Sequence, residues 1–300
     1  MIEVNNLVKK FGARLVLDQV SFQVEPGRVT AFLGPNGSGK TTTMRIILGL
    51  EEPTSGTALV DGKPYQRLQD PMFRVGALLD ARTAHPGRSA FNHLLALAHT
   101  HGISASRVDE VIGIVGLTEV AGNRVGGYSL GMRQRLGIAG AMLGDPETYI
   151  FDEPVNGLDP DGVRWFRDLV RSFADEGRTV FLSSHLISEV EITADHVIML
   201  GRGRVLADSS LIALALLEDR VRTRVRSPRL SDLAAVLRAD GLAVHSTGGM
   251  LVIDGATPDM VGELAAVHSI PLHELGVERD SLEDVYRSLT EPELEYRHAR

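Results

Sequence analysis

The segment Gly34-Pro35-Asn36-Gly37-Ser38-Gly39-Lys40-Thr41 constrains this chain more than any other feature. It fits the pattern G-x-x-x-x-G-K-[ST], and it lies between a short apolar strand predicted over 28–33 and a helix predicted over 41–50. Glycines let the backbone curve so that successive N–H groups point at phosphate oxygens, and the helix N-terminus adds partial positive charge. The motif predicts an α/β nucleotide-binding core in which Lys40 reaches the β- and γ-phosphates and the Thr41 hydroxyl ligates Mg²⁺.

A second predicted strand, over 148–151, ends in the carboxylates Asp152 and Glu153. On their own, two acids at a strand end are equally well explained by a solvated turn. Beside a phosphate-binding loop they predict chemistry instead. Asp152 would hold Mg²⁺ directly or through water, and Glu153 would act as the general base that polarises an attacking water.

Composition excludes several other classes of protein. The 300 residues carry 31 basic and 39 acidic side chains, a formal net charge of −8, which disfavours a general nucleic-acid binder. Because cysteine is absent, disulfides, thiolate metal sites and cysteine nucleophiles are excluded. The sequence has neither the apolar run of a signal peptide nor about 18 uninterrupted apolar residues, so we expect no direct membrane insertion.

Length and pattern predict two domains. Strands that alternate with helices predict an α/β core with a parallel sheet in residues 1–218, with a mostly helical part over about 85–145. Residues 219–300 look like a separate small α+β unit, in which the arginines at alternate positions 220–226 mark a strand with one wet face. Its predicted order is β-α-β-β-α-β with strands near 220–226, 242–245, 250–253 and 270–275, and a last helix that begins at Ser281. This order predicts a ferredoxin-like domain.

Further segments occur in the order typical of the ATPase subunits of ABC transporters, which the chain resembles over about residues 1–215. The segment 128–134 (YSLGMRQ) resembles the family signature at the start of a helix, and 154–159 (PVNGLD) resembles the D-loop. His185 resembles the switch histidine, and Phe11 occupies the place of the aromatic residue that stacks on adenine. The resemblance implies a P-loop ABC-type ATPase core with a mixed sheet and a helical signature subdomain.

The resemblance also implies ATP and Mg²⁺ as cofactors, and it assigns roles to residues. Glu153 and His185 would be catalytic, and Mg²⁺ would be bound by Thr41, Asp152 and Asp80. Nucleotide contacts would come from Phe11, Gly34, Pro35, Asn36, Gly37, Ser38, Gly39, Lys40, Thr41, Thr42, Ser129, Gly131 and Asp159. Ser129 and the Gly131 N–H would reach the γ-phosphate held by a second copy of the chain or a related subunit, since one chain has one loop and one signature.

Two departures from the family pattern stand out. The segment 76–80 (GALLD), expected as a loop, has Asp80 where the family usually has a glutamine that reaches Mg²⁺. Asp80 can accept on the metal side but brings a charge. The signature has Leu130 and Met132 where glycine and glutamine are commoner, which removes one flexible position.

The implied function is ATP hydrolysis that drives separate transmembrane permease subunits from the cytoplasmic side of the cell membrane, where the chain would be peripheral. The segment 281–286 (SLEDVY) favours the branch that exports drugs and antibiotics. One alternative is a non-transport ABC-type ATPase, although those typically carry two ATPase units or a coiled-coil insertion. Another is a regulatory ATP-binding module whose C-terminal domain senses a ligand. A GTPase is disfavoured because the sequence has no N-K-x-D element.

Overall fold

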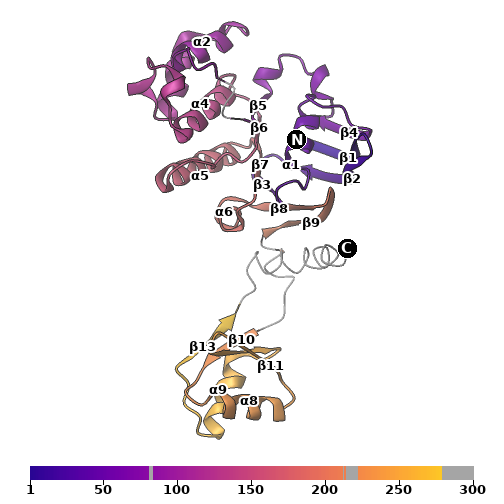
Figure 1. Cartoon of the computed structure of the whole chain (residues 1–300), viewed down its shortest axis with the longest axis vertical. Coiled ribbons are helices and arrows are strands. Elements are labelled where there is room, and N and C mark those ends of the chain that lie inside the picture. Colours follow the sequence, from indigo (N-terminus) through magenta and orange to yellow (C-terminus); the bar gives the residue numbers. More distant parts are fainter. Residues whose placement is uncertain (81–83, 212, 214–221, 279–300) are drawn as a thin grey trace. The chain divides into compact units, whose positions relative to one another are not determined.

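The computed structural model of the chain describes residues 1–80, 84–211, 213 and 222–278 (Figure 1). The chain divides into two compact units, Met1–Leu211 and Ile212–Arg300. The boundary expected at 218/219 and the helix expected from Ser281 both lie outside the described residues. Among those that are described, no helix is long and apolar enough to cross a membrane.

A six-stranded sheet forms the centre of the first unit. Its order is β5 (Val75–Leu78), β6 (Thr148–Phe151), β7 (Thr179–Ser184), β3 (Arg28–Leu33), β8 (His196–Gly201) and β9 (Arg204–Ser210). All neighbours pair in parallel except β8 and β9, which are antiparallel. Since β6, β7 and β3 are adjacent, the residues that follow their carboxyl ends meet at one edge of the sheet.

The sequence prediction was wrong about β5. The segment 76–80 was expected to be a loop, but Val75–Leu78 pairs with Thr148–Phe151 as a strand, so that only Leu79 and Asp80 lie beyond it. The pairing brings the end of β5 next to the end of β6. A short strand is easily mistaken for a loop when it contains glycine, because glycine weakens the local strand signal.

A second, antiparallel sheet covers one side of the central sheet, in the order β2 (Arg14–Val24), β1 (Ile2–Phe11) and β4 (Ser55–Val60). Figure 1 shows this sheet and α1 (Lys40–Ile47) on one side of the central strands and α5 (Pro160–Asp175) and α6 (Ile187–Thr193) on the other. The core between the sheets contains Phe22, Phe32 and Phe181, whose ring centroids lie 5.3–5.6 Å apart.

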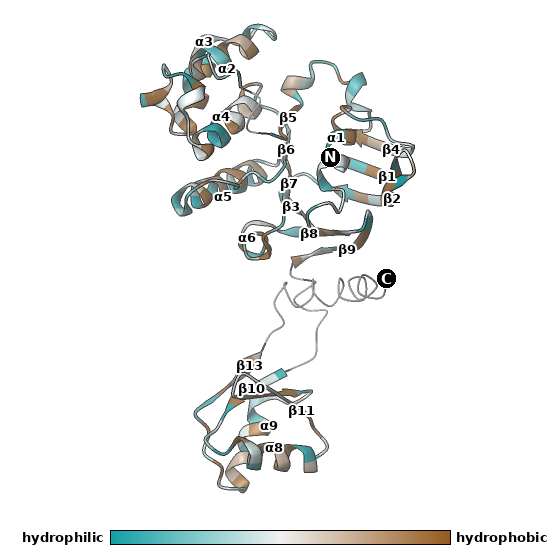
Figure 2. Ribbon diagram, in the orientation of Figure 1, coloured by the Kyte–Doolittle hydropathy of each residue, from teal (hydrophilic) through white to brown (hydrophobic). Residues whose placement is uncertain are grey.

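Helix α5 begins at an Asp-Pro pair, a combination that favours the start of a helix. Asp159 is its N-cap and accepts a hydrogen bond from the Gly162 N–H at 2.9 Å, and Pro160 occupies the first turn. Hydrophilic and hydrophobic residues alternate around the helix (Figure 2), and the buried face includes Phe166, Val170 and Phe173.

The predicted helical part lies between β5 and β6. It contains α2 (Ala90–His99), α3 (Ala105–Ile114) and α4 (Leu130–Met142), which begin at the serine N-caps Ser89, Ser104 and Ser129. Short 3₁₀ turns lie within this part at Thr118–Val120 and Val125–Gly127, and two more precede β5 at Tyr65–Arg67 and Pro71–Phe73.

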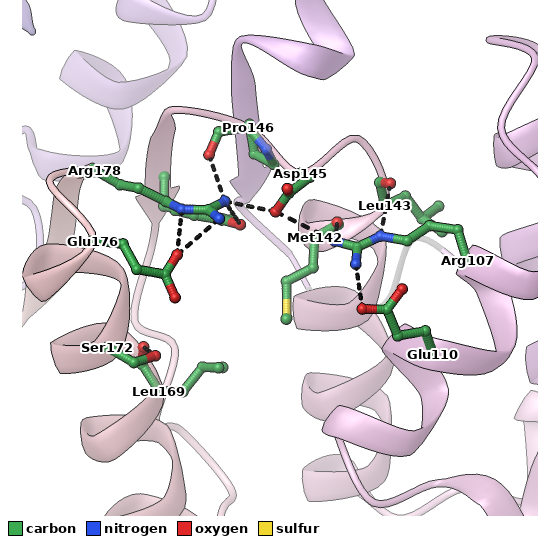
Figure 3. A network of polar contacts seen from close by, with 11 residues as sticks. Arg107, Glu110, Met142, Leu143, Asp145, Pro146, Leu169, Ser172, Glu176 and Arg178 are labelled. Carbon is green, nitrogen blue, oxygen red and sulfur yellow. Dashed lines mark hydrogen bonds and ion pairs between the residues drawn. The ribbon is translucent and has the colours of Figure 1, made fainter.

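A polar network ties this helical part to the central sheet (Figure 3). Arg107 of α3 donates to the Met142 carbonyl at 2.9 Å, at the end of α4, and approaches an Asp145 carboxylate oxygen at 3.5 Å. Arg178, in the turn before β7, donates to the same Asp145 oxygen at 2.7 Å and forms an ion pair with Glu176 at 2.8 Å. One carboxylate therefore bridges α3 and the entry to β7.

The second unit has the predicted order of elements: β10 (Arg222–Arg226), α8 (Leu230–Ala239), β11 (Ala243–Thr247), β12 (Met250–Asp254), α9 (Pro258–Val267) and β13 (Glu274–Glu278). Its antiparallel sheet has the order β11-β12-β10-β13. The last strand begins at Glu274, later than the expected 270–275. The Ile270 N–H still donates to the Ala265 carbonyl near the end of α9, at 2.8 Å, so it is not available for strand pairing. Arg222 and Arg224 pair with Asp254 at 3.0 Å and Glu274 at 2.5 Å.

Candidate functional site

The loop 34–39 connects β3 to α1 with the backbone that its glycines predict. Gly37 and Gly39 have positive φ angles of 82° and 114°, a region that side chains disfavour. Gly34 is needed for space, since a Cβ there would lie 2.4 Å from the Leu200 carbonyl oxygen. The loop therefore packs against β8 while it curves toward α1.

Lys40 is the first residue of α1 and is almost completely buried. Its Nζ donates to the Gly34 carbonyl at 2.6 Å and lies 3.5 Å from a carboxylate oxygen, Oε1, of Glu153. The ammonium group is thus held inside the loop, next to the carboxylate that follows β6.

Thr41 and Asp152 come together as the sequence predicts. The Thr41 hydroxyl donates to Asp152 Oδ2 at 2.6 Å, and the Ser183 hydroxyl of β7 donates to Oδ1 at 2.5 Å. A hydroxyl and a carboxylate are the hard oxygen ligands that Mg²⁺ takes when water and substrate phosphates complete its coordination, so these residues fit the ion. Among the described residues, no group of three or more His, Cys, Asp or Glu side chains could hold a metal ion.

Asp80 lies two residues beyond β5 and is exposed. In the parallel register Leu78 pairs with Phe151, which brings Asp80 to the same edge of the sheet as Glu153. Its role as a magnesium ligand stays a prediction.

Each carboxylate oxygen of Glu153 lies next to a basic side chain. Its Oε2 lies 2.8 Å from Nδ1 of His185, which follows β7, while Oε1 faces Lys40. Oε1 is buried and accepts no hydrogen bond from any described residue. A buried carboxylate oxygen with a free lone pair, held in place through its partner oxygen, is suited to accept a proton.

An open cavity of about 420 Å³ lies beside this carboxylate. Its lining contains Phe11, Arg14, Val16, Asn36, Gly37, Gly39, Lys40, Thr41, Thr42 and Glu153. Phe11 is 48% exposed, and Lys9 Nζ lies 4.6 Å from the centroid of its ring. A half-exposed aromatic side chain on the cavity wall is available for stacking. Sequence reasoning missed Arg14 and Val16. The available signal was the Gly12 turn, which returns the chain past Phe11 so that Arg14 pairs with it.

Six of the predicted contacts lie outside the lining of this cavity. Gly34, Pro35 and Ser38 belong to the loop 34–39 itself, whereas Ser129, Gly131 and Asp159 lie elsewhere in the chain. Ser129 is exposed and caps α4 by accepting from the Met132 N–H at 3.2 Å. Gly131 packs against the Gly157 carbonyl, and Asp159 caps α5. Since none of the three lines the cavity of its own chain, their contacts with nucleotide stay a prediction that needs a second subunit.

Comparisons with known proteins agree with this geometry. Residues 17–156 match the family model described as ABC transporter, and residues 221–283 match a domain of unknown function. Residues 123–191 also match a model described as an AAA domain of a putative AbiEii toxin.

Curated relatives extend the comparison. The uncharacterized ABC transporter ATP-binding protein YhcH of Bacillus subtilis is 34% identical over 304 residues, with 100% of this chain and 99% of the relative covered. The bacitracin transport ATP-binding protein BcrA of Bacillus licheniformis is 40% identical over 211 residues, which cover 69% of each chain. The lantibiotic transport ATP-binding protein SrtF of Streptococcus pyogenes is 34% identical over 225 residues, covering 75% of this chain and 97% of the relative.

Solved structures match the first part of the chain. The ATP-binding subunit of an ABC transporter superposes with a TM-score of 0.66 at 27% identity, covering 72% of this chain and 92% of that one. A dimeric ATP-binding cassette in a post-hydrolysis state, bound to ADP and Pi, gives a TM-score of 0.64 at 25% identity, covering 70% and 99%.

Proposed function

Because this chain belongs to the ATP-binding proteins of ABC transporters, we propose that two copies of it, or one copy and a related subunit, enclose two ATP·Mg²⁺ and use their hydrolysis to drive separate membrane subunits. The chain is an ATPase of the ABC type. The observation that carries the proposal is the Glu153 carboxylate, held between Lys40 at 3.5 Å and His185 at 2.8 Å on the wall of the loop-lined cavity.

The loop binds the triphosphate through its backbone N–H groups and the N-terminus of α1, and Lys40 moves from the Gly34 carbonyl to the β- and γ-phosphates. Thr41 and Asp152 would hold Mg²⁺, which supplies positive charge against the charge that develops on the phosphates. Phe11, which lines the cavity, stacks on the base.

Glu153 Oε1 accepts a proton from the attacking water. The water oxygen bonds to the γ-phosphorus while the bond between that phosphorus and the oxygen bridging to the β-phosphate breaks, which gives ADP and phosphate. His185 holds Oε2 and keeps the carboxylate directed at the water. The γ-phosphate is also reached from the other subunit, by the Ser129 hydroxyl and the Gly131 N–H at the N-terminus of α4. Hydrolysis cleaves the γ-phosphate, which residues of both subunits contact, and the dimer then opens.

We place the chain at the cytoplasmic face of the membrane and the cargo in the class of antibiotic peptides. The support is the similarity to proteins named for bacitracin and lantibiotic transport. A pull-down of this chain from solubilised membranes would identify its membrane partner. Co-expression of the two should raise bacitracin resistance, and Glu153→Gln should abolish the gain. Resistance that is unchanged by the wild-type pair would refute the cargo class and leave the ATPase assignment standing.

The ATPase mechanism is tested by Glu153→Gln in the purified chain. The variant should bind ATP, release no phosphate, and accumulate as an ATP-dependent dimer in light scattering, because binding is kept while proton transfer is lost. Glu147→Gln is the matched control, since Glu147 is an exposed acid at the opposite end of β6, paired with Arg74 at 3.0 Å. Normal turnover by Glu153→Gln would show that Glu153 is not the base.

A further inference from the structure

Glu153 has a backbone conformation that its residue type disfavours. Its φ angle is +49°, in the left-handed region, although it carries a long side chain. Such conformations persist where the surroundings over-determine them, and they occur at active sites where a group must be aimed. The neighbours that hold this backbone therefore decide where the carboxylate points.

Both backbone polar groups of Glu153 are held by side chains. Its N–H donates to the Ser183 hydroxyl at 2.9 Å, and its carbonyl accepts from Gln134 Nε2 at 3.3 Å. Ser183 is completely buried and Gln134 is 5% exposed, so water does not compete freely for either contact. Ser183 belongs to β7, which is adjacent to β6, whereas Gln134 comes from the helical part of the chain, 19 residues away.

The helix that carries Gln134 is the one whose N-terminus is Ser129. Its first turn lies directly on the loop after Glu153, because a Cβ on Gly131 would lie 2.7 Å from the Gly157 oxygen and a Cβ on Gly157 would meet the Leu130 side chain at 2.4 Å. Helix α4 therefore contacts the segment 153–157 through backbone packing and through one specific hydrogen bond.

We propose that Gln134 is a positioning residue whose side-chain amide, by holding the Glu153 carbonyl, ties the aim of the water-activating carboxylate to the placement of α4. The proposal rests on the proposed function, in which the N-terminus of α4 binds the γ-phosphate in the opposite site. A subunit whose α4 is engaged by the second nucleotide then holds its own Glu153 in the productive pose. The orientation of Glu153 in one site therefore depends, through α4 of the same chain, on whether nucleotide is bound in the other site.

The test replaces Gln134 by alanine and, without change of size, by glutamate, which cannot donate to the carbonyl. We expect kcat for phosphate release to fall by about tenfold or more with KM for ATP unchanged within about twofold, because sub-ångström misplacement of a catalytic group affects the chemical step. In the Glu153→Gln background, either substitution should leave the ATP-dependent dimer intact.

Gln66→Ala is the matched control, since Gln66 also donates through Nε2 to a carbonyl, that of Gly49 at 3.2 Å, away from the site. Thermal melts check that each variant is folded. If Gln134→Ala is unfolded, the kinetic test is made with Gln134→Glu instead. An unchanged kcat in the folded variant overturns the proposal, and so does an equal loss of kcat and of trapped dimer. Failure of Glu153→Gln alone to bind ATP or dimerise would instead refute the proposed function.

Discussion

Gly131 allows α4 to begin against the loop that follows Glu153, so Gly131→Ala tests how closely the two segments must approach. The added Cβ would lie 2.7 Å from the Gly157 carbonyl oxygen, and real Cβ contacts are not shorter than 3.0 Å. The start of α4 must therefore move by a few tenths of an ångström. Since a 1 Å misplacement costs about 100-fold in rate, we expect kcat to fall roughly four- to tenfold.

Loss of stability does not account for such a result. Alanine favours the helical state over glycine by up to about 1 kcal/mol, which opposes the strain of the contact. The folded variant should then show slower phosphate release and, in the Glu153→Gln background, a higher ATP concentration at half-maximal dimerisation. The dimer is measured by light scattering across an ATP titration.

Gly127→Ala is the control, because a Cβ at Gly127 meets nothing within 4 Å and its φ angle is not positive. It lies two residues before the Ser129 cap, so it tests the same segment without the close contact. Wild-type turnover and dimerisation in Gly131→Ala would refute the argument that close packing of α4 on the loop sets the site.

The remaining predictions concern the network at the other end of the sheet. Burial raises the pKa of Tyr149 to about 12 from 10, so the folded state keeps a proton that the unfolded chain loses above pH 10. Wild-type stability should therefore fall by up to about 2.7 kcal/mol between pH 10 and pH 12, a loss that Tyr149→Phe should not show in urea titrations across that range. Asp145→Asn removes the charge between Arg107 and Arg178, at 3.5 and 2.7 Å, and because the carboxylate is 61% exposed we expect a loss of about 1 kcal/mol or less that shrinks in 0.5 M salt. A salt-independent loss would contradict the electrostatic origin.

Local signals made much of the site predictable. The strands at 28–33 and 148–151 appear with the predicted bounds. The glycine-rich loop and the acid pair that follow them were recognisable because each is a run of residues adjacent in the sequence. Asp159 caps its helix for the same reason, since a cap needs a side chain and an N–H three residues on. The signature and the switch histidine were identified by resemblance and motif order.

Tertiary structure decided what depends on strand order and on distant contacts. The sequence predicts a loop at Val75–Leu78, whereas in the structure this segment pairs with β6 as a strand. Strand β9 is defined by its pairing with β8, which the sequence does not show. Gln134 is the last residue of the signature-like segment 128–134, but the sequence does not show what it binds, because that contact exists only when Glu153 turns its carbonyl toward α4. The chain alone therefore specified which reactive groups are present, whereas the packing of a helix on a strand end, which local preferences do not encode, determined how they are aimed.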